Sequence, residues 1–284
     1  MYLLFNIGGT KMRIAAAENT DAIDTAVMMP TPRSFEDGMA TFEKAARDLL
    51  QGQKPDALSG GIAGTFASDR RALITSPNLP NWTGKPLADR LEKIFGVPVL
   101  LANDAMLEAL GEATEGAGKG HRIVGYITVG TGIGGCRIVN GRIDEYASGF
   151  EPGFQIIDLT GDPCPTCALP LYLETYVSGT AVKARYGMDP AQIDDPAIRD
   201  ELARALAYGL NNTIVHWSPD IIVLGGGMIM GENPIPLERI RFHLAAVMKI
   251  FPRIPPVEKS ALGEKAGFYG ALEFLAQHEN QKNF

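Results

Sequence analysis

The chain has 284 residues with a formal net charge of −7, and 45% of its residues are hydrophobic. This length suits two domains that each bury a core, and the acidic balance excludes a general nucleic-acid or membrane-surface binder. Because three cysteines are too few for a disulfide framework and no apolar run approaches the ~18 residues of a membrane span, we expect a cytoplasmic protein.

The first half of the chain is expected to alternate strands with helices. The apolar patterns predict strands at 2–6, 11–17, 22–28, 57–62, 72–75 and 97–101. They predict helices over 36–50, from 86 to just before Gly96, and from 105 to about 115. The Gly-Ala-Gly-Lys-Gly run at 116–120 is the best linker candidate.

The second half continues in the same style. A hairpin at 122–139 precedes an irregular Gly/Pro-rich region at 149–170, and a strand is expected at 220–224. Helices are expected at 171–178, 179–187, 194–217, 236–250 and 264–278. Strands alternating with helices and short hairpins predict an α/β class.

The stretch from Ile127 to Val139 carries glycine at 130, 132, 134 and 135 between two β-branched runs. Gly130, Gly132 and Gly135 match the spacing of a dinucleotide fingerprint, which requires a helix after the glycines. A second strand follows instead, which argues against an NAD-dependent oxidoreductase. Glycine turns expose backbone N–H groups and bind anions, so the stretch is better interpreted as a phosphate-binding hairpin.

A similar hairpin opens the chain. A strand at 3–7 is followed by the turn Gly8-Gly9-Thr10-Lys11 and a second strand. Two such turns about half a domain apart suggest two lobes that each contribute one turn to a shared nucleotide. Two ordinary hairpin turns are the alternative.

Asp104 is the candidate catalytic residue, because it lies where a buried strand meets a helix N-terminus. A plain helix cap is the alternative, since Asp before a helix stabilises it by roughly 1 kcal/mol. A catalytic role for Asp104 is favoured over a helix cap by the two glycine turns and by three further polar residues, Asn103, Glu151 and Glu174. A carboxylate that accepts a hydroxyl proton beside phosphates held by backbone N–H groups is typical of phosphoryl transfer.

Several motifs, in order and covering nearly the whole chain, resemble the ROK sugar kinases. They are Asn-Ile-Gly-Gly-Thr-Lys at 6–11, Ala-Asn-Asp-Ala at 102–105, Gly-Thr-Gly-Ile-Gly-Gly at 130–135, Glu-Pro-Gly at 151–153, Leu-Glu-Thr-Tyr-Val-Ser-Gly at 173–179 and Gly-Gly-Gly at 225–227. The resemblance implies the actin/hexokinase-like (ribonuclease H-like) fold, with two lobes closing on ATP and a hexose. We expect lobes at 1–118, completed by a C-terminal helix at 264–284, and at 119–263.

The resemblance also implies a function and its residues. Asp104 would activate the 6-hydroxyl of glucose or an N-acetylhexosamine such as N-acetylglucosamine or N-acetylmannosamine. The residues implied to bind the sugar are Gly64, Asn78, Asn103, Asp104, Glu151 and Glu174. Those implied to bind ATP are Gly8, Gly9, Thr10, Lys11, Gly130, Thr131, Gly132, Gly225 and Gly226. Mg²⁺ would lie near Asn6 through the ATP phosphates, and a homodimer is common in the family.

The chain departs from the family pattern at two kinds of position. Asn6 replaces an Asp that helps to hold Mg²⁺, and an amide brings no charge. Phe154 replaces a His that serves the sugar and a structural zinc, and we expect Phe154 to be buried instead. Cys164 and Cys167 alone make half a zinc site, so we expect no zinc; a modified zinc site and a redox pair are the alternatives.

Two related functions compete with an ATP-dependent hexose kinase. A sugar-responsive transcription regulator would carry a DNA-binding domain before the first turn, and only five residues precede Asn6. A catalytically weak sugar-binding sensor would agree with Asn6 and Phe154. An ATP-dependent transfer assay over several hexoses separates these possibilities.

Overall fold

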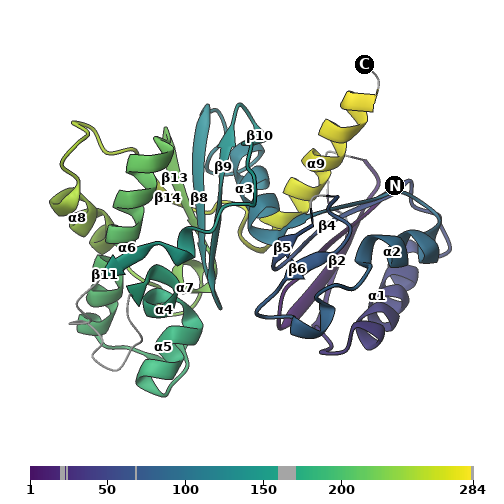
Figure 1. Ribbon diagram of the computed structural model, residues 1–284, viewed down its shortest axis with the longest axis horizontal. Coiled ribbons are helices and arrows are strands. Elements are labelled where there is room, and N and C mark those ends of the chain that lie inside the picture. Colours follow the sequence, from purple (N-terminus) through teal and green to yellow (C-terminus); the bar gives the residue numbers. More distant parts are fainter. Residues whose placement is uncertain (20–22, 24, 68, 159–170, 283–284) are drawn as a thin grey trace. The chain divides into compact units, whose positions relative to one another are not determined.

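The computed structural model describes residues 1–19, 23, 25–67, 69–158 and 171–282. Residues Met1–Thr114 with Glu264–Phe284 form one compact unit, and Glu115–Gly263 form a second. Both units contain strands and helices, so the expected α/β class is confirmed (Figure 1). Among the described residues, every helix is too short or too polar to cross a bilayer.

The described part of the first unit is built on a five-stranded sheet in the order β3-β2-β1-β4-β7. Its strands are β1 (Tyr2–Ile7), β2 (Lys11–Ala17), β3 (Thr25–Pro30), β4 (Ala57–Ile62) and β7 (Val99–Asn103), with a small hairpin of β5 (Thr65–Phe66) and β6 (Leu73–Thr75). The helices are α1 (Phe35–Leu50), α2 (Leu87–Phe95), α3 (Asp104–Thr114) and α9 (Ala266–Lys282), with 3₁₀ turns η1 (Pro80–Trp82) and η4 (Gly263–Lys265). Strands β1, β4 and β7 run parallel, so their carboxyl ends meet at one edge.

Side-chain alternation along β1 explains how this sheet is covered. Leu3, Phe5 and Ile7 belong to the core beneath α1 and α2, where the rings of Phe5 and Phe42 meet edge to face at 5.2 Å. The other face carries α3 and α9 (Figure 1). These two helices cross closely, since a Cβ at Gly270 would lie 1.8 Å from the Leu107 carbonyl oxygen.

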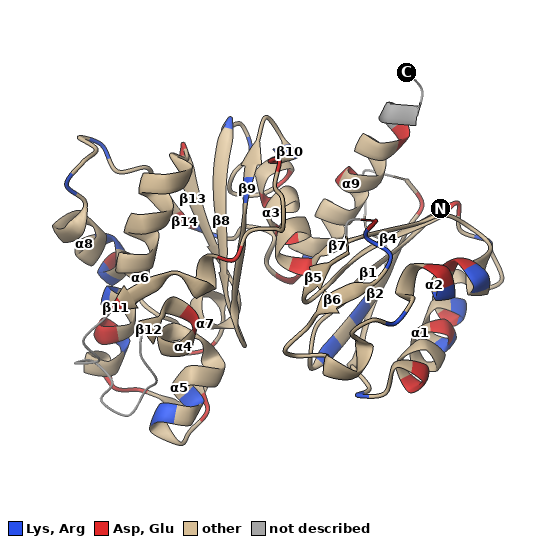
Figure 2. Ribbon diagram, in the orientation of Figure 1, with Lys and Arg blue, Asp and Glu red and all other residues tan. Residues whose placement is uncertain are grey.

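Charged residues of both signs follow the outer surface of α1 and α2 (Figure 2). On α1 they form i,i+4 pairs between Lys44 and Asp48 and between Arg47 and Glu43. Ser34 caps the start of α1 by accepting a hydrogen bond from the Asp37 N–H. An apolar inner face, a capped start and paired outer charges account for the helix expected at 36–50.

The described part of the second unit has a sheet in the order β10-β9-β8-β13-β14. Its strands are β8 (Ile123–Val129), β9 (Ile133–Val139), β10 (Arg142–Ile143), β13 (Ile221–Gly225) and β14 (Val257–Lys259), with a separate pair β11 (Ile156–Asp158) and β12 (Leu171–Tyr172). The helices are α4 (Leu173–Val177), α5 (Gly179–Tyr186), α6 (Pro196–Trp217), α7 (Gly227–Met230) and α8 (Leu237–Val247), with 3₁₀ turns η2 (Pro152–Phe154) and η3 (Pro190–Gln192). The core lies between the sheet and these helices, chiefly α6.

Some element boundaries differ from the sequence-based expectation. The helix expected at 171–178 is strand β12 followed by the five-residue α4, and the Ser178 hydroxyl then caps α5. The helix expected at 236–250 ends at Val247, and the strand expected at 22–28 is Thr25–Pro30. β14 follows Pro255-Pro256 and was not anticipated, because three residues are too short for a periodic signal.

Candidate functional site

Candidate residues of the first unit gather at the carboxyl edge of its parallel strands. In the sheet register Asn6 of β1 pairs with Gly61 of β4, and Ile62 of β4 pairs with Asn103 of β7. The β1–β2 turn, the loop after β4 and the start of α3 therefore leave the sheet side by side. Ligands of α/β sheets bind at this kind of edge.

The side chain of Asn103 joins two of these segments. Its Nδ2 donates to the Gly64 carbonyl oxygen at 3.0 Å, and its Oδ1 accepts from the Met106 N–H at 3.2 Å. Gly64 has a φ of +139°, and a Cβ there would lie 2.4 Å from the Thr75 carbonyl oxygen. Only glycine fits this position, and the bond from Asn103 ties the loop after β4 to the start of α3.

Asp104 is the first residue of α3, and its role differs from a plain helix cap. The capping bond to the Met106 N–H is made by Asn103, whereas Asp104 Oδ1 accepts from the adjacent Ala105 N–H at 3.0 Å. A Cβ at Gly61 would lie 2.8 Å from the Asp104 Cα, so glycine there admits the Asp104 backbone. Burial raises the pKa of Asp104 to about 6, although backbone N–H groups of Ala105 and Asp104 oppose the rise. A carboxylate with this pKa suits general-base chemistry near neutral pH.

The β1–β2 turn lies beside Asn78. The Gly8 N–H donates to the Lys11 carbonyl oxygen at 2.9 Å and closes the turn. A Cβ at Gly9 would lie 2.6 Å from the Asn78 Cβ, so the absent side chain leaves room for Asn78. The Thr31 hydroxyl donates to the Gly8 carbonyl oxygen at 2.8 Å. Thr10, Lys11 and Asn78 are exposed, where phosphate or sugar oxygens can reach them.

Asn6 is buried at the end of β1, with 8% of its surface exposed. Its amide Nδ2 lies 3.1 Å from the point where a Cβ of Gly267 would stand, so it faces the start of α9. Within the described residues, no cluster of three or more His, Cys, Asp or Glu side chains could hold a metal ion. Asn6 carries a neutral amide oxygen, and such a donor fits Mg²⁺, which beside phosphate substrates usually keeps several waters and takes only one or two protein ligands.

In the second unit, the β8–β9 turn is supported by two neighbouring helices. The Gly130 N–H donates to the Gly132 carbonyl oxygen at 2.9 Å, and the Gly179 N–H at the start of α5 donates to the Gly130 carbonyl oxygen at 2.8 Å. The Thr180 N–H donates to the Thr131 carbonyl oxygen at 3.3 Å. From α4, Glu174 Oε2 accepts from the Ile133 N–H at 2.6 Å. A Cβ at Gly132 would lie 2.6 Å from the same Oε2, so glycine is what lets the carboxylate approach.

Glu151 is brought to this hairpin by the η2 turn. A Cβ at Gly153 would lie 2.4 Å from the Ile133 carbonyl oxygen and 3.3 Å from the Glu174 Cβ. The Glu-Pro-Gly segment therefore packs directly on β9 and α4, and Glu151 itself is exposed. The expected burial of Phe154 is wrong: its surface is 51% exposed, with its ring centroid 6.0 Å from that of Tyr172. The buried positions of this turn are taken by Pro152 and Gly153, which leaves Phe154 on the outside.

Gly225 and Gly226 end β13 against the same hairpin. A Cβ at Gly225 would lie 2.2 Å from the Tyr126 hydroxyl oxygen, and one at Gly226 would lie 2.4 Å from the Val129 carbonyl oxygen. Gly226 also has a φ of +83°, which favours glycine. The backbone of this segment therefore lies directly beside the end of β8 and leads into α7.

The candidate residues thus form one set in each unit. The first unit brings together Gly8, Gly9, Thr10, Lys11, Gly64, Asn78, Asn103 and Asp104; the second brings together Gly130, Thr131, Gly132, Glu151, Glu174, Gly225 and Gly226. The loops of the first set are held by Thr31 and Ser76. The sequence did not predict these two residues, because their partners are backbone atoms distant in the chain. Cys164 and Cys167 lie outside the described residues, and Cys136 is a buried thiol in β9.

The model of the ROK family matches residues 2–278. The chain belongs to the ROK family. A glucokinase of Thermotoga maritima is 27% identical over 306 residues, covering 96% of this chain and 96% of that protein. An N-acetyl-D-glucosamine kinase of Escherichia coli O6:H1 is 29% identical over 301 residues, covering 95% of this chain and 98% of that protein.

Solved structures agree with the family assignment. A ROK family glucokinase from Streptomyces griseus, in complex with glucose and AMPPNP, superposes with a TM-score of 0.80 at 28% identity and covers 97% of this ROK chain and 99% of its own. The expected actin/hexokinase-like fold is therefore confirmed. The relatives act on more than one sugar, so family membership leaves the sugar of this ROK protein open.

Proposed function

We propose that this ROK protein is an ATP-dependent sugar kinase that phosphorylates the 6-hydroxyl of a hexose, glucose or an N-acetylhexosamine. In the reaction, the sugar O6–H gives its proton to a base while O6 bonds to the γ-phosphorus. The bond from that phosphorus to the bridging oxygen breaks, and ADP leaves. Family membership and the names of two kinase relatives support the reaction class.

The single observation that carries the proposal is Asp104, whose raised pKa of about 6 suits it to take the O6 proton. Asn103 would hold the start of α3 in place and keep Asp104 oriented, because its amide is bonded at both ends. Exact placement matters, because a base must lie within hydrogen-bond reach of the proton it removes.

The sugar contacts would come from Glu151, Glu174, Asn78 and the Gly64 backbone. One oxygen of Glu174 already accepts from the Ile133 N–H. Since a carboxylate offers about four lone-pair sites, Glu174 retains capacity for sugar hydroxyls. A single residue would then link the sugar to the phosphate-binding turn.

The glycine turns would hold the nucleotide. Backbone N–H groups at Gly8–Thr10 and Gly130–Gly132 suit phosphate oxygens, and Gly225-Gly226 would border the adenosine. Mg²⁺ bound to the phosphates would neutralise part of their charge, with Asn6 as a neutral oxygen donor nearby. The proposal includes lobes at 1–118 with 264–284 and at 119–263.

A catalytically weak sugar sensor is the second candidate. Two observations favour it: Asn6 is an uncharged residue at the end of β1, and the Phe154 side chain offers no hydrogen bond in the turn after Glu151. Such a protein would bind sugar without appreciable transfer.

An ADP-release assay with glucose, N-acetylglucosamine and N-acetylmannosamine tests the proposal, with calorimetric sugar binding measured on the same preparation. A kinase gives sugar-dependent ADP release that Asp104→Asn removes. A sensor gives sugar binding with ADP release no faster than in Asp104→Asn. Absence of both overturns the two candidates together.

A further inference from the structure

A small hairpin separates two of the proposed sugar contacts. We call residues 65–67 and 69–75 the β5–β6 hairpin; it follows Gly64 and precedes Asn78. Thr65 pairs with Thr75, and the Ala67 N–H donates to the Ala72 carbonyl oxygen at 3.1 Å. At its base, Ser76 Oγ donates to the Ala63 carbonyl oxygen at 2.6 Å. The position of the hairpin therefore contributes to where Gly64 and Asn78 lie.

The hairpin has little internal support of its own. β5 and β6 have two and three residues, and their pairing is irregular between Thr65 and Phe66. An isolated two-stranded hairpin is marginally stable at best in water. Leu73 anchors the hairpin in the core, whereas Ile74 and Thr75 are exposed. Contacts outside the hairpin must therefore fix its tip.

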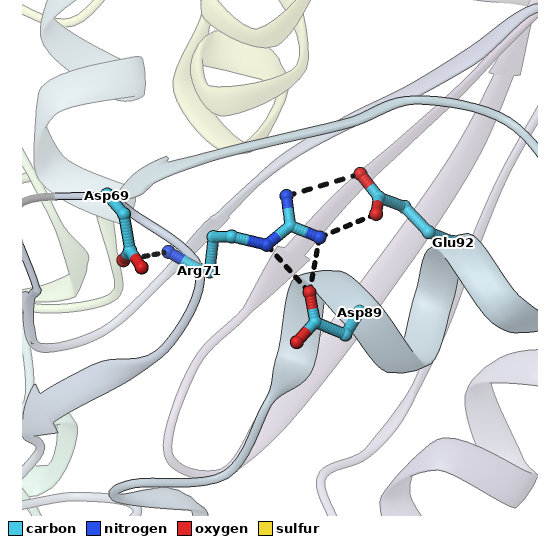
Figure 3. Close-up of polar contacts among 4 residues, drawn as sticks. All are labelled: Asp69, Arg71, Asp89 and Glu92. Atoms are coloured by element: carbon cyan, nitrogen blue, oxygen red, sulfur yellow. Dashed lines mark hydrogen bonds and ion pairs between the residues drawn. The ribbon is translucent and has the colours of Figure 1, made fainter.

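Arg71 supplies several of those contacts: its side chain binds two carboxylates of α2 (Figure 3), and its backbone also bonds to α2. Its Nε donates to Asp89 Oδ1 at 2.6 Å, and a terminal nitrogen donates to Glu92 Oε2 at 2.5 Å. The Arg71 carbonyl oxygen accepts from the Ala88 N–H at 3.1 Å. On the tip itself, Asp69 Oδ1 accepts from the Arg71 N–H at 3.0 Å.

The Arg71 guanidinium is suited to fixing the hairpin on α2. Asp89 and Glu92 lie three residues apart on α2, so both carboxylates face the same planar guanidinium. Hydrogen bonds to both carboxylates raise the pKa of Arg71, with Glu92 the larger cause, so the guanidinium stays charged. Lysine offers a point charge without the fork, so it cannot repeat the bonds to both carboxylates.

We propose that Arg71 is a positioning residue for the sugar site: by fixing the β5–β6 hairpin on α2, it holds Gly64 and Asn78 in the geometry that binds sugar. This inference rests on the proposed sugar-binding function. It predicts an effect on sugar affinity rather than on the chemical step, because Arg71 touches neither Asp104 nor the glycine turns.

The test compares Arg71→Met and Arg71→Lys with the wild type. We expect Arg71→Met to raise the KM for sugar about threefold to tenfold, the range expected when a partly exposed charge network is lost, with kcat and the KM for ATP within about twofold. Arg71→Lys should lie between the two. Hydrogen exchange over residues 65–75 should become faster in Arg71→Met, and saturating sugar should restore most of the protection.

Arg90→Met is the matched control. Arg90 lies on the same helix and pairs with Glu36 of α1 at 3.3 Å, away from the hairpin. It should leave sugar KM and exchange over 65–75 unchanged. Arg71→Met behaving like Arg90→Met, or lowering kcat instead of sugar affinity, would overturn the positioning role. Failure of the proposed function would show separately, as a wild type that neither binds nor phosphorylates any sugar.

Discussion

The two glycine hairpins share one design and differ in what supports them. Each has three turn residues, Gly8–Thr10 between β1 and β2 and Gly130–Gly132 between β8 and β9. The first turn is held by Thr31, which donates a side-chain and a backbone hydrogen bond to it. The second is held by the start of α5 and by the Glu174 carboxylate. The same backbone module is thus fixed by one residue in one unit and by two helices in the other.

The strands beside the hairpins differ in a second way. In the first sheet β7 ends at Asn103 and is followed by Asp104, whereas β14 of the second sheet ends at Lys259 and is followed by Ser260. The carboxyl of Asp104, at the first of these ends, has its pKa raised to about 6. Two sheets with the same strand order can therefore play unequal parts in the chemistry. In our proposal the first unit carries the base, and the second carries the phosphate turn that is held by two helices.

The largest effect is expected when the Asp104 carboxylate, which distinguishes the first unit, is replaced. Asp104→Asn should lower kcat by about 10²–10⁴, because an amide cannot accept the hydroxyl proton. Sugar binding should stay within about tenfold of the wild type, since the amide keeps its hydrogen-bonding capacity. Turnover and calorimetric binding on the same sample check both parts. Turnover close to wild type would remove Asp104 from the role of base.

The dependence of kcat/KM on pH should also reveal the role of Asp104, without a mutation. The pKa of Asp104 is raised from 3.8 to about 6, so the carboxyl is protonated, and inactive as a base, below that pH. We expect kcat/KM for sugar to fall about tenfold per pH unit below 6 and to level off above it. The residual activity of Asp104→Asn should lack this acidic limb; an unchanged limb would assign it to another group.

Two glycines of the second hairpin provide a matched pair. In Gly132→Ala the new Cβ would lie 2.6 Å from Glu174 Oε2, whereas nothing lies within 4 Å of a Cβ at Gly130. We expect Gly132→Ala to raise the KM values for ATP and sugar roughly tenfold by displacing Glu174, a cost in the usual range for a disturbed buried contact. Gly130→Ala should raise both KM values less than Gly132→Ala, because its Cβ does not meet Glu174. Equal effects would mean that the Glu174 contact does not support the turn.

The smallest expected effect concerns the ends of β1 and β8. Asn6 pairs with Gly61 in the first sheet and Thr128 pairs with Gly225 in the second, and both Asn6 and Thr128 are uncharged residues. Asn6→Asp should lower the Mg²⁺ concentration for half-maximal rate by about a few fold, because a hard cation prefers an anionic oxygen. A Mg²⁺ titration that matches the wild type would place Asn6 outside the metal environment.

The sequence predicted well the parts that depend on local pattern. Buried β-branched strands, glycine turns and amphipathic helices appear close to their expected positions, as for α1 and α6, because period and capping are written in neighbouring residues. The contacts that the sequence did not predict depend on distant partners. Glu174 meets Ile133 across 41 residues, and Arg71 meets Asp89 across 18. The sequence predicts a buried Phe154, since packing would replace a metal site there, but its position in the η2 turn leaves it exposed.

The central claim is that this ROK protein transfers phosphate to a sugar 6-hydroxyl with Asp104 as the base. Two-dimensional ¹H–³¹P NMR of reactions containing ATP, Mg²⁺ and each of the three sugars tests it most directly. The account predicts phosphorus correlated with the two C6 protons of at least one sugar in the wild-type reaction. It predicts no such signal, over the same time, with Asp104→Asn. Phosphate on another carbon, or a 6-phosphate formed equally fast by Asp104→Asn, would contradict it.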